Sequence, residues 1–106
     1  MASHKEYLEF ILEQLSELDD VSYRAMMGEY ILYCDGKAVG GIYDDRFLIK
    51  PTRSALAMMP DADRELPYEG AREMLLVEEV ENKAFLCRLL RAVAEDLPAP
   101  KARGKR

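Results

Sequence analysis

Residues 24–50 carry two tight-turn signals within a run of aromatic and β-branched residues, and this pattern constrains the fold more than any other. The first signal is Asp35-Gly36 and the second is Asp44-Asp45. Asp and Gly tolerate the positive φ of two-residue hairpin loops, so each pair is expected to connect two antiparallel strands. With a further strand over residues 21–27, the stretch predicts a four-stranded antiparallel meander.

The two turns also predict the strand register, because directly opposed residues share a sheet face. Tyr33 is expected opposite Ala38, which places Leu32 opposite Val39. Asp-Asp is a weaker turn signal than Asp-Gly, and a slip of one residue would exchange the faces of a strand. In this register one face is predicted to be almost pure core, with Ile31, Tyr33, Ala38, Gly40, Ile42, Phe47 and Ile49.

The opposite sheet face is predicted to be the interaction surface, since three helices are needed to cover the first face and little chain is left. Exposed apolar area rimmed by cations is typical of an interface. A mid-strand glycine, Gly41, is expected to let a partner chain approach the backbone. The alternative is that the third helix covers this face as a second core. The residues assigned to the interaction face are Tyr30, Leu32, Val39, Gly41, Tyr43, Arg46, Leu48 and Lys50.

Helical spacing of apolar residues predicts three helices around the meander. The first is expected over residues 4–18, starting with a capping box formed by Ser3 and Glu6. The second covers residues 52–59, and the third follows Asn82 as N-cap and ends before Pro98. With a strand over residues 73–77, the order is α-β-β-β-β-α-β-α. This order predicts an α+β, two-layer domain with an antiparallel sheet of about five strands and three helices.

Length and composition indicate one domain over residues 1–97 followed by a flexible basic tail over residues 98–106. The 106 residues contain no apolar run near the roughly 20 needed to span a bilayer and no visible secretory signal, so a cytoplasmic location is expected. Two cysteines are too few for a disulfide framework, and a single histidine offers little material for a zinc site. We therefore expect no metal and no cofactor.

Charge is distributed unevenly along the chain, which has a net charge of −5. Binding of nucleic acid depends on cations that contact phosphates, so an acidic domain is a poor general candidate. A weak nucleic-acid contact through the basic tail remains an alternative. Its cations are Lys101, Arg103, Lys105 and Arg106.

A small ligand-binding or enzymatic domain that uses Cys34, Arg24 and Arg46, with Tyr33 nearby, is a further alternative. A cysteine nucleophile needs a base and an environment that lowers its pKa. The single histidine, His4, is remote in sequence from Cys34. The carboxylate pair in the second turn is explained by local hydrogen bonding, for which turns favour Asp. The sequence therefore predicts no enzymatic activity.

Residues 24–33 (RAMMGEYILY), Asp35-Gly36 and residues 41–50 (GIYDDRFLIK) together form a long motif. It resembles the N-terminal domain of the TfoX/Sxy competence regulators, including small stand-alone members, and the likeness extends through residues 66–68 and the terminal helix. The resemblance implies an α+β domain linked to regulation of DNA-uptake genes in bacteria, without catalytic residues. We expect the chain to lack the helical C-terminal domain of the full-length regulators. The predicted function is a non-enzymatic regulatory domain whose partner is another protein or a second copy.

Overall fold

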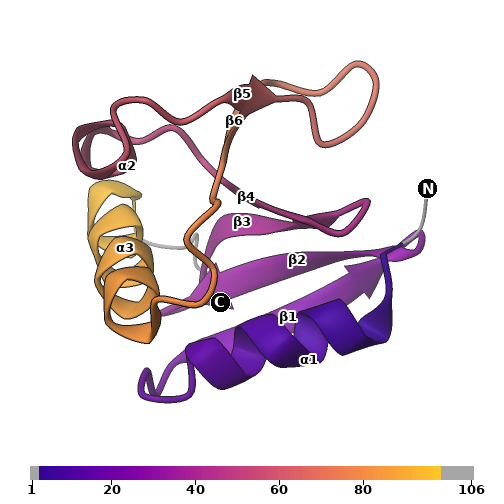
Figure 1. The fold of residues 1–106 in the computed structure, drawn as a ribbon, viewed down its shortest axis with the longest axis horizontal. Helices are drawn as coiled ribbons and strands as arrows, with labels where there is room; N and C mark the ends of the chain where they lie inside the picture. The colour runs from indigo at the N-terminus through magenta and orange to yellow at the C-terminus, as the bar shows by residue number, and fades with distance from the viewer. Residues whose placement is uncertain (1–2, 99–106) are drawn as a thin grey trace, which may run out of the picture.

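The computed structural model describes residues 3–98 and contains three helices and one six-stranded antiparallel sheet (Figure 1). The strand order in the sheet is β1-β2-β3-β4-β6-β5. The predicted α+β class and the order of elements are confirmed, with the two-residue strand β5 as an addition. The elements are α1 (Lys5–Gln14), β1 (Val21–Met26), β2 (Glu29–Cys34), β3 (Lys37–Tyr43), β4 (Arg46–Ile49), α2 (Arg53–Met58), β5 (Arg64–Glu65), β6 (Met74–Leu76) and α3 (Lys83–Asp96).

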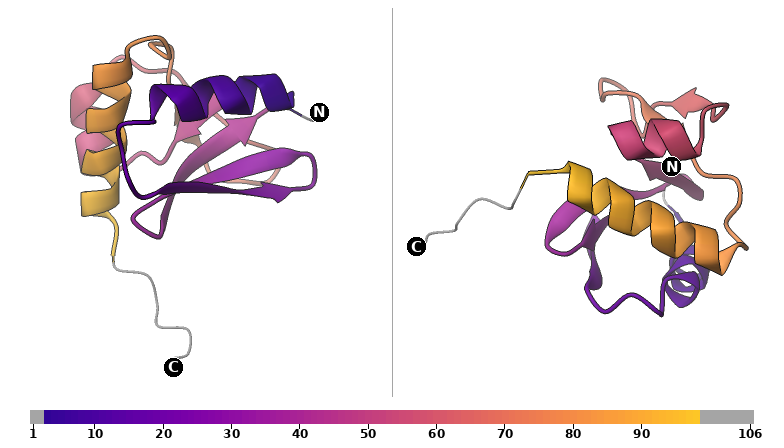
Figure 2. Two further views of the ribbon diagram at one scale, coloured as in Figure 1. Left: turned by 90° about the horizontal axis from the view of Figure 1, so that it is seen from below. Right: turned by 90° about the vertical axis from the view of Figure 1, so that its left-hand side faces the viewer.

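The helices cover one face of the sheet. Helix α1 runs along the first strands, α3 crosses near one end of the strands, and α2 lies beside α3 (Figures 1 and 2). The left view of Figure 2 shows that none of the helices in residues 3–98 lies on the opposite side of β1, β2 and β3. The meander is therefore sealed on one side by helices, and only loop segments are available to cover the other side.

Side-chain caps explain where two of the helices begin. Thr52 accepts a hydrogen bond from the backbone N–H of Ala55 at the start of α2, and Asn82 accepts one from Phe85 at the start of α3. Each cap satisfies a backbone donor that has no partner within the helix. The capping box expected for α1 is not formed: its N-cap is His4, without a side-chain cap, and the helix ends at Gln14.

Both expected two-residue turns are present with the backbone geometry that their sequences favour. Asp35 and Gly36 have φ of 56° and 76°, and Asp44 and Asp45 have φ of 53° and 57°. Positive φ at both central positions matches the right-handed twist of the flanking strands. The predicted register of the second hairpin is confirmed, with Gly41 opposite Leu48.

The register of the first hairpin is correct only next to its turn. Tyr33 is opposite Ala38 as predicted, but Leu32 is opposite Gly40 rather than Val39 because a β-bulge lies between Leu32 and Tyr33. A bulge places two residues of one strand against one of its partner and shifts the rest of the register. Beyond this point every pairing of β2 with β3 is offset by one residue.

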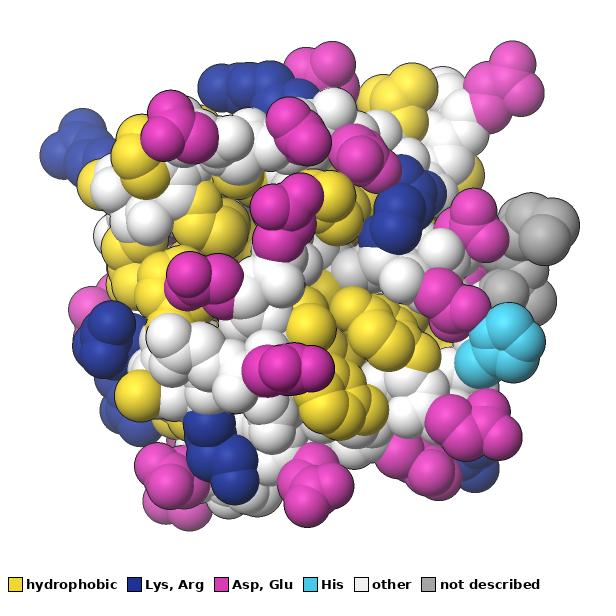
Figure 3. Space-filling view, viewed as in Figure 1, with side chains coloured by type: hydrophobic (Ala, Val, Ile, Leu, Met, Phe, Trp, Pro, Cys, Tyr) yellow, Lys and Arg dark blue, Asp and Glu magenta, His cyan; other side chains and the backbone are white. Residues whose placement is uncertain are grey.

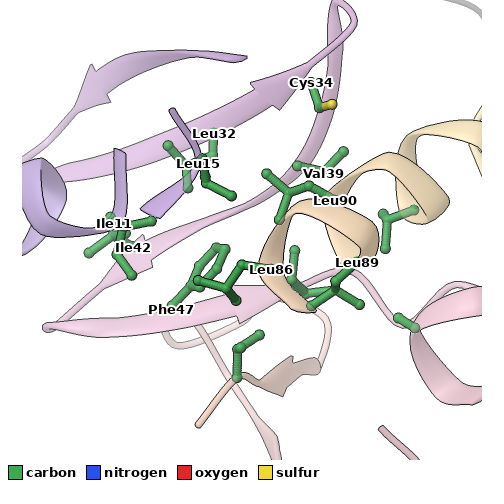
Figure 4. Close-up of a cluster of buried hydrophobic side chains, with 14 of the residues drawn as sticks. Ile11, Leu15, Leu32, Cys34, Val39, Ile42, Phe47, Leu86, Leu89 and Leu90 are labelled. Carbon is green, nitrogen blue, oxygen red and sulfur yellow. The ribbon is translucent and has the colours of Figure 1, made fainter. Parts of the chain in front are cut away.

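The bulge changes which residues form the core (Figure 4). Leu32 and Val39, assigned to the interaction face, have no exposed surface and pack in the helix-covered core. Ile31 and Tyr33, assigned to the core, are instead only half-buried. The core unites strand residues with one stripe each of α1 and α3, including Leu8, Ile11, Leu15, Leu32, Cys34, Val39, Ile42, Phe47, Ile49, Leu86, Leu89, Leu90 and Val93.

Candidate binding surface

The sheet face opposite the helices is not the open surface that the sequence suggested. The segment between β5 and β6 folds over part of it, so that Pro67 is buried and the ring of Tyr68 lies 6.2 Å from the ring of Tyr43. Tyr43 is only 6% exposed, and Leu48 has no exposed surface. The assignment of these two residues to an exposed face is wrong, because a loop without regular structure supplies cover that we attributed only to helices.

The need for glycine at position 41 has a structural explanation that differs from the expected approach of a partner. A Cβ atom at this position would lie 2.5 Å from the carbonyl oxygen of Tyr30 and 2.7 Å from the ring of Tyr43. Both distances are shorter than those that real Cβ atoms adopt. The space beside Gly41 is filled by the protein's own atoms, and the residue is buried.

Arg46 fastens the second hairpin turn to the segment that follows β5. Its Nη1 atom is 2.5 Å from Oε1 of Glu65, its Nη2 donates to the carbonyl of Leu66 at 3.2 Å, and its Nε donates to the carbonyl of Tyr43 at 3.0 Å. A guanidinium group suits this task because its donors are held in a rigid fork. The geometry gives Arg46 a clear structural role in holding the loop.

The remaining residues assigned to the interaction face lie apart from one another. Tyr30 is half-buried and makes an edge-to-face contact with Tyr23, with ring centroids 5.9 Å apart. Lys50 is half-buried after β4, on the side of the sheet where Tyr43 lies. The residues of the predicted interaction face are thus divided among three places: the helix-covered core, buried positions on the opposite face of the sheet, and separate half-buried positions.

Cys34, Arg24 and Arg46 do not form a common site. Cys34 precedes the turn at one end of β3, and Arg46 follows the turn at the other end. Arg24 is opposite Ile31, on the face away from the core, whereas Cys34 is part of the core. Burial raises the pKa of the Cys34 thiol, which favours the protonated and less nucleophilic form.

Sequence reasoning missed a polar cluster that holds the start of α1 against two turns. The hydroxyl of Ser3 donates to Oε1 of Glu29 at 2.6 Å and accepts from the backbone N–H of Asp45 at 3.0 Å. His4 Nδ1 lies 2.6 Å from Oδ2 of Asp45, and the backbone N–H of His4 donates to Oδ1 at 2.8 Å. The capping-box signal at Ser3 and Glu6 pointed to a local partner, but the partners lie 26 and 42 residues away.

This cluster fastens the chain and does not form a nucleophile–base pair. The hydrogen bond that the ring of His4 donates to Asp45, together with the charge of Asp45, raises the pKa of His4, and the hydrogen bonds donated by His4 lower the pKa of Asp45. The Ser3 hydroxyl is engaged with Glu29 and Asp45 rather than with His4. Among residues 3–98, no three His, Cys, Asp or Glu side chains are grouped so that they could hold a metal ion.

Strand β1 is the most exposed regular element of the fold. Five of its six residues are exposed, and it lies at the edge of the sheet, where β2 is its one neighbour among the described strands. Tyr23 is 44% exposed, and Met27, in the turn after the strand, is 96% exposed with φ of 53°. The edge of β1, with its exposed side chains, is therefore the candidate binding surface.

On the face of the molecule viewed in Figure 1, by contrast, the hydrophobic patches are separated by carboxylates (Figure 3).

Two further expectations concern the basic tail and the absence of a membrane-spanning segment. The cations of the basic tail, Lys101, Arg103, Lys105 and Arg106, lie outside the residues that the structure describes. Within residues 3–98, every helix is too short or too polar to traverse a lipid bilayer.

Comparison with known proteins places the chain in a family. It is 36% identical over 104 residues to an uncharacterized 12.7 kDa protein in the trpE 5′ region of Spirochaeta aurantia, and the match covers 97% of this chain and 90% of the relative. No solved structure matches the chain. The model of the TfoX N-terminal domain matches residues 13–97, which include every strand of the sheet and helices α2 and α3. The chain therefore belongs to the TfoX N-terminal domain family.

Proposed function

We propose that this chain is a non-enzymatic regulatory domain that binds an extended segment of a protein partner along strand β1. The observation that carries the proposal is the open edge of this strand, which has a neighbour on one side and exposed side chains along its length. An open edge presents backbone N–H and C=O groups that can pair with another strand. The regulatory part of the proposal rests on membership of the family.

The two edges of the sheet differ in how they are protected. Strand β5, at one edge, has two residues, Arg64 and Glu65, and both are charged. Strand β1, at the other edge, has six residues, no proline and one charge, at Arg24. Short length, charge and proline are the usual devices that prevent strands from pairing at an edge. Their scarcity on β1 supports pairing with a partner as the purpose of this edge.

Side chains beside the edge supply apolar contact area. Tyr23 and Met26 are exposed on β1, and Met27 projects from the following turn. Tyrosine and methionine are enriched at protein interfaces. A positive φ at a residue other than glycine costs about 1–2 kcal/mol. The strained and exposed position of Met27 supports a role in contact with another molecule.

The experiment compares association of the full chain with that of two variants of equal charge change. Tyr23→Glu with Met26→Glu places charges beside the edge, and Leu56→Glu with Leu66→Glu places them at other exposed apolar positions. Sedimentation velocity at rising concentration measures self-association, and cross-linking in cells that express the protein measures binding of other chains. The β1 variant should lose association while the control retains it.

Hydrogen exchange separates edge pairing from other modes of contact. Pairing should slow exchange of the outward-facing amides of residues 21–26 when the partner is bound, because these amides gain acceptors. If association persists in the β1 variant, or if the β1 amides exchange at the same rate in the bound and free protein, the proposal is wrong.

A further inference from the structure

A groove of about 440 Å³ lies between the sheet face opposite the helices and the segment that joins β5 to β6. Its floor includes Ile31 and Ala38, which the bulge in the first hairpin turns away from the core. The volume is within the range of roughly 300–1,000 Å³ that is usual for small-molecule sites. The residues that carry the argument below are Tyr43, Lys50, Pro67, Tyr68, Arg72 and Met74.

The charge of this groove is opposite to that of the protein as a whole. Of the residues that the structure describes, Lys50 and Arg72 are the charged ones that line it, without a carboxylate. The chain has 20 acidic residues against 15 Lys and Arg, and three other hollows with charged walls in residues 3–98 each include Asp or Glu. Two cations that face one groove without an acid favour an anionic occupant.

Neither cation is used by the fold. Within residues 3–98, the side chains of Lys50 and Arg72 make no hydrogen bond or ion pair. Arg46, close by in the sequence, makes three such contacts and holds the loop. The contrast shows that the loop is fastened by Arg46, which leaves Lys50 and Arg72 available to a ligand.

The groove also offers aromatic surfaces. Tyr43 is buried, and Tyr68 is tilted over it at 56° with 57% of its surface exposed. A planar ring can stack on the free side of Tyr68 and contact the apolar floor. Arginine adds a second planar surface, because the guanidinium group stacks on aromatic rings.

We propose that this groove binds a small molecule that has an aromatic or heteroaromatic ring and one anionic group, a phosphate or a carboxylate. The ring lies against Tyr68 and the apolar floor, and the anion is held by Lys50 and Arg72. The ring requirement follows from the tyrosines, and the anion requirement follows from the two cations without acids. This site is distinct from the β1 edge and does not depend on the function proposed for that edge.

The test is a titration of the ¹⁵N-labelled full chain followed by NMR. The probes are AMP and indole-3-acetate, which combine a ring with a phosphate or a carboxylate. Adenosine and inorganic phosphate supply the halves of AMP alone, and indole and acetate supply those of indole-3-acetate. At least one combined probe should shift the amides of Ala38, Lys50 and residues 68–72 saturably. Its two halves should bind at least about tenfold more weakly, which is the effect of one charge-assisted contact.

Variants separate the proposed contacts from general charge effects. Lys50→Gln and Arg72→Gln should each weaken binding of the combined probe by about tenfold or more. The matched control is Arg88→Gln, which removes the same charge from an exposed position on α3. Tyr68→Ala should weaken ring binding, and a thermal unfolding curve close to that of the wild type is the check that the fold is retained.

The proposal is overturned if neither combined probe gives saturable shifts at the groove up to about 10 mM, a limit close to the weakest measurable affinities. It is also overturned if the Lys50 and Arg72 variants bind like the Arg88 control. An acidic peptide that binds the groove equally well without any aromatic residue would identify a protein occupant instead and would likewise overturn it.

Discussion

Strands β1 and β3 belong to the same meander, yet their environments are opposite. Five of the six residues of β1 are exposed, whereas β3 is buried without interruption from Val39 to Tyr43. Both strands contain a majority of small or apolar residues. The difference comes from cover. Helix α3 packs on one face of β3, and the segment between β5 and β6 lies on the other, whereas β1 is an edge strand.

The comparison shows that a central strand of a small α+β domain can be sealed on both faces without a second helical layer. Pro67 and Tyr68 provide cover that depends on an anchor, and that anchor is Arg46. The edge strand receives no such loop. Buried residues are therefore concentrated in the centre of the sheet, whereas the residues of the edge strand are mostly exposed.

The largest loss of stability should follow truncation of buried side chains in β4, on either face of the sheet. Phe47→Ala removes a side chain from the helix-covered core, and Leu48→Ala removes one from the opposite face. Both side chains have no exposed surface, so each variant should lower the free energy of unfolding by about 2–5 kcal/mol. Urea denaturation measures both. A loss below about 1 kcal/mol for Leu48→Ala would show that the second face is not sealed.

A smaller effect is expected at Gly40, where the central strands approach closely. A Cβ atom there would lie 2.2 Å from the carbonyl oxygen of Leu48 and 3.0 Å from Cα of Ile49. Both are backbone atoms, so Gly40→Ala should cost about 1–3 kcal/mol and speed amide exchange in β3 and β4. The comparison variant is Gly70→Ala: a Cβ atom there would meet no described atom within 4 Å apart from its chain neighbours, but φ is 88°, so only local strain is added. Faster exchange in β3 with this variant would contradict the steric explanation.

A still smaller, pH-dependent effect is expected where the start of α1 meets the second turn. The pKa of His4 is raised from 6.5 by Asp45, so the stability from this bond is present below pH 6.5 and is lost as pH rises through the folded-state pKa. The pKa of Asp45 is lowered from 3.8, so the stability that its charged form contributes is present above pH 3.8 and is lost as the pH falls through the lowered pKa. The bond between His4 and Asp45 therefore contributes fully between pH 3.8 and pH 6.5.

The measurement is the difference in Tm between the wild type and His4→Ala across pH 3–9. This difference should be largest near pH 5 and should decrease as the pH rises above 6.5 and through the raised pKa of His4. The NMR titration of the His4 ring should have a midpoint above 6.5. A pH-independent difference in Tm would contradict the proposed bond.

The smallest effect on stability is expected at the edge strand. Met26→Ala changes a residue that is already 39% exposed, so the free energy of unfolding should change by less than about 0.5 kcal/mol. The contrast with Leu48→Ala tests the comparison directly, because both variants shorten an apolar side chain in the same sheet. A loss above about 2 kcal/mol would show that β1 is covered in solution, for example by a second copy.

Local signals in the sequence predicted the parts of the structure that depend on local chemistry. Both turns, the cap at Asn82 and the register of the second hairpin follow from residues near one another in the chain. The resemblance to the TfoX family, the α+β class and the order of elements were also correct. The capping box failed because the polar side chain of Ser3 found partners far along the chain.

The candidate surface was the least predictable part. A bulge at Leu32 moved that residue and Val39 into the core, and no local pattern distinguishes a bulge from a regular ladder. Which edge remains open, and which loop covers a face, likewise depend on contacts between distant segments.

The helices, the strands of the meander and their order could be predicted from local patterns, because turn conformation, helix capping and hydrophobic periodicity act over a few residues. Which faces are covered depends instead on how the folded chain packs. Covering a face depends on where a distant segment can bury apolar area, and the anchors that hold it, such as Arg46 with Glu65 and Leu66, exist only when the chain is folded. The open edge of β1 and the cationic groove beside Tyr68 are consequences of that packing.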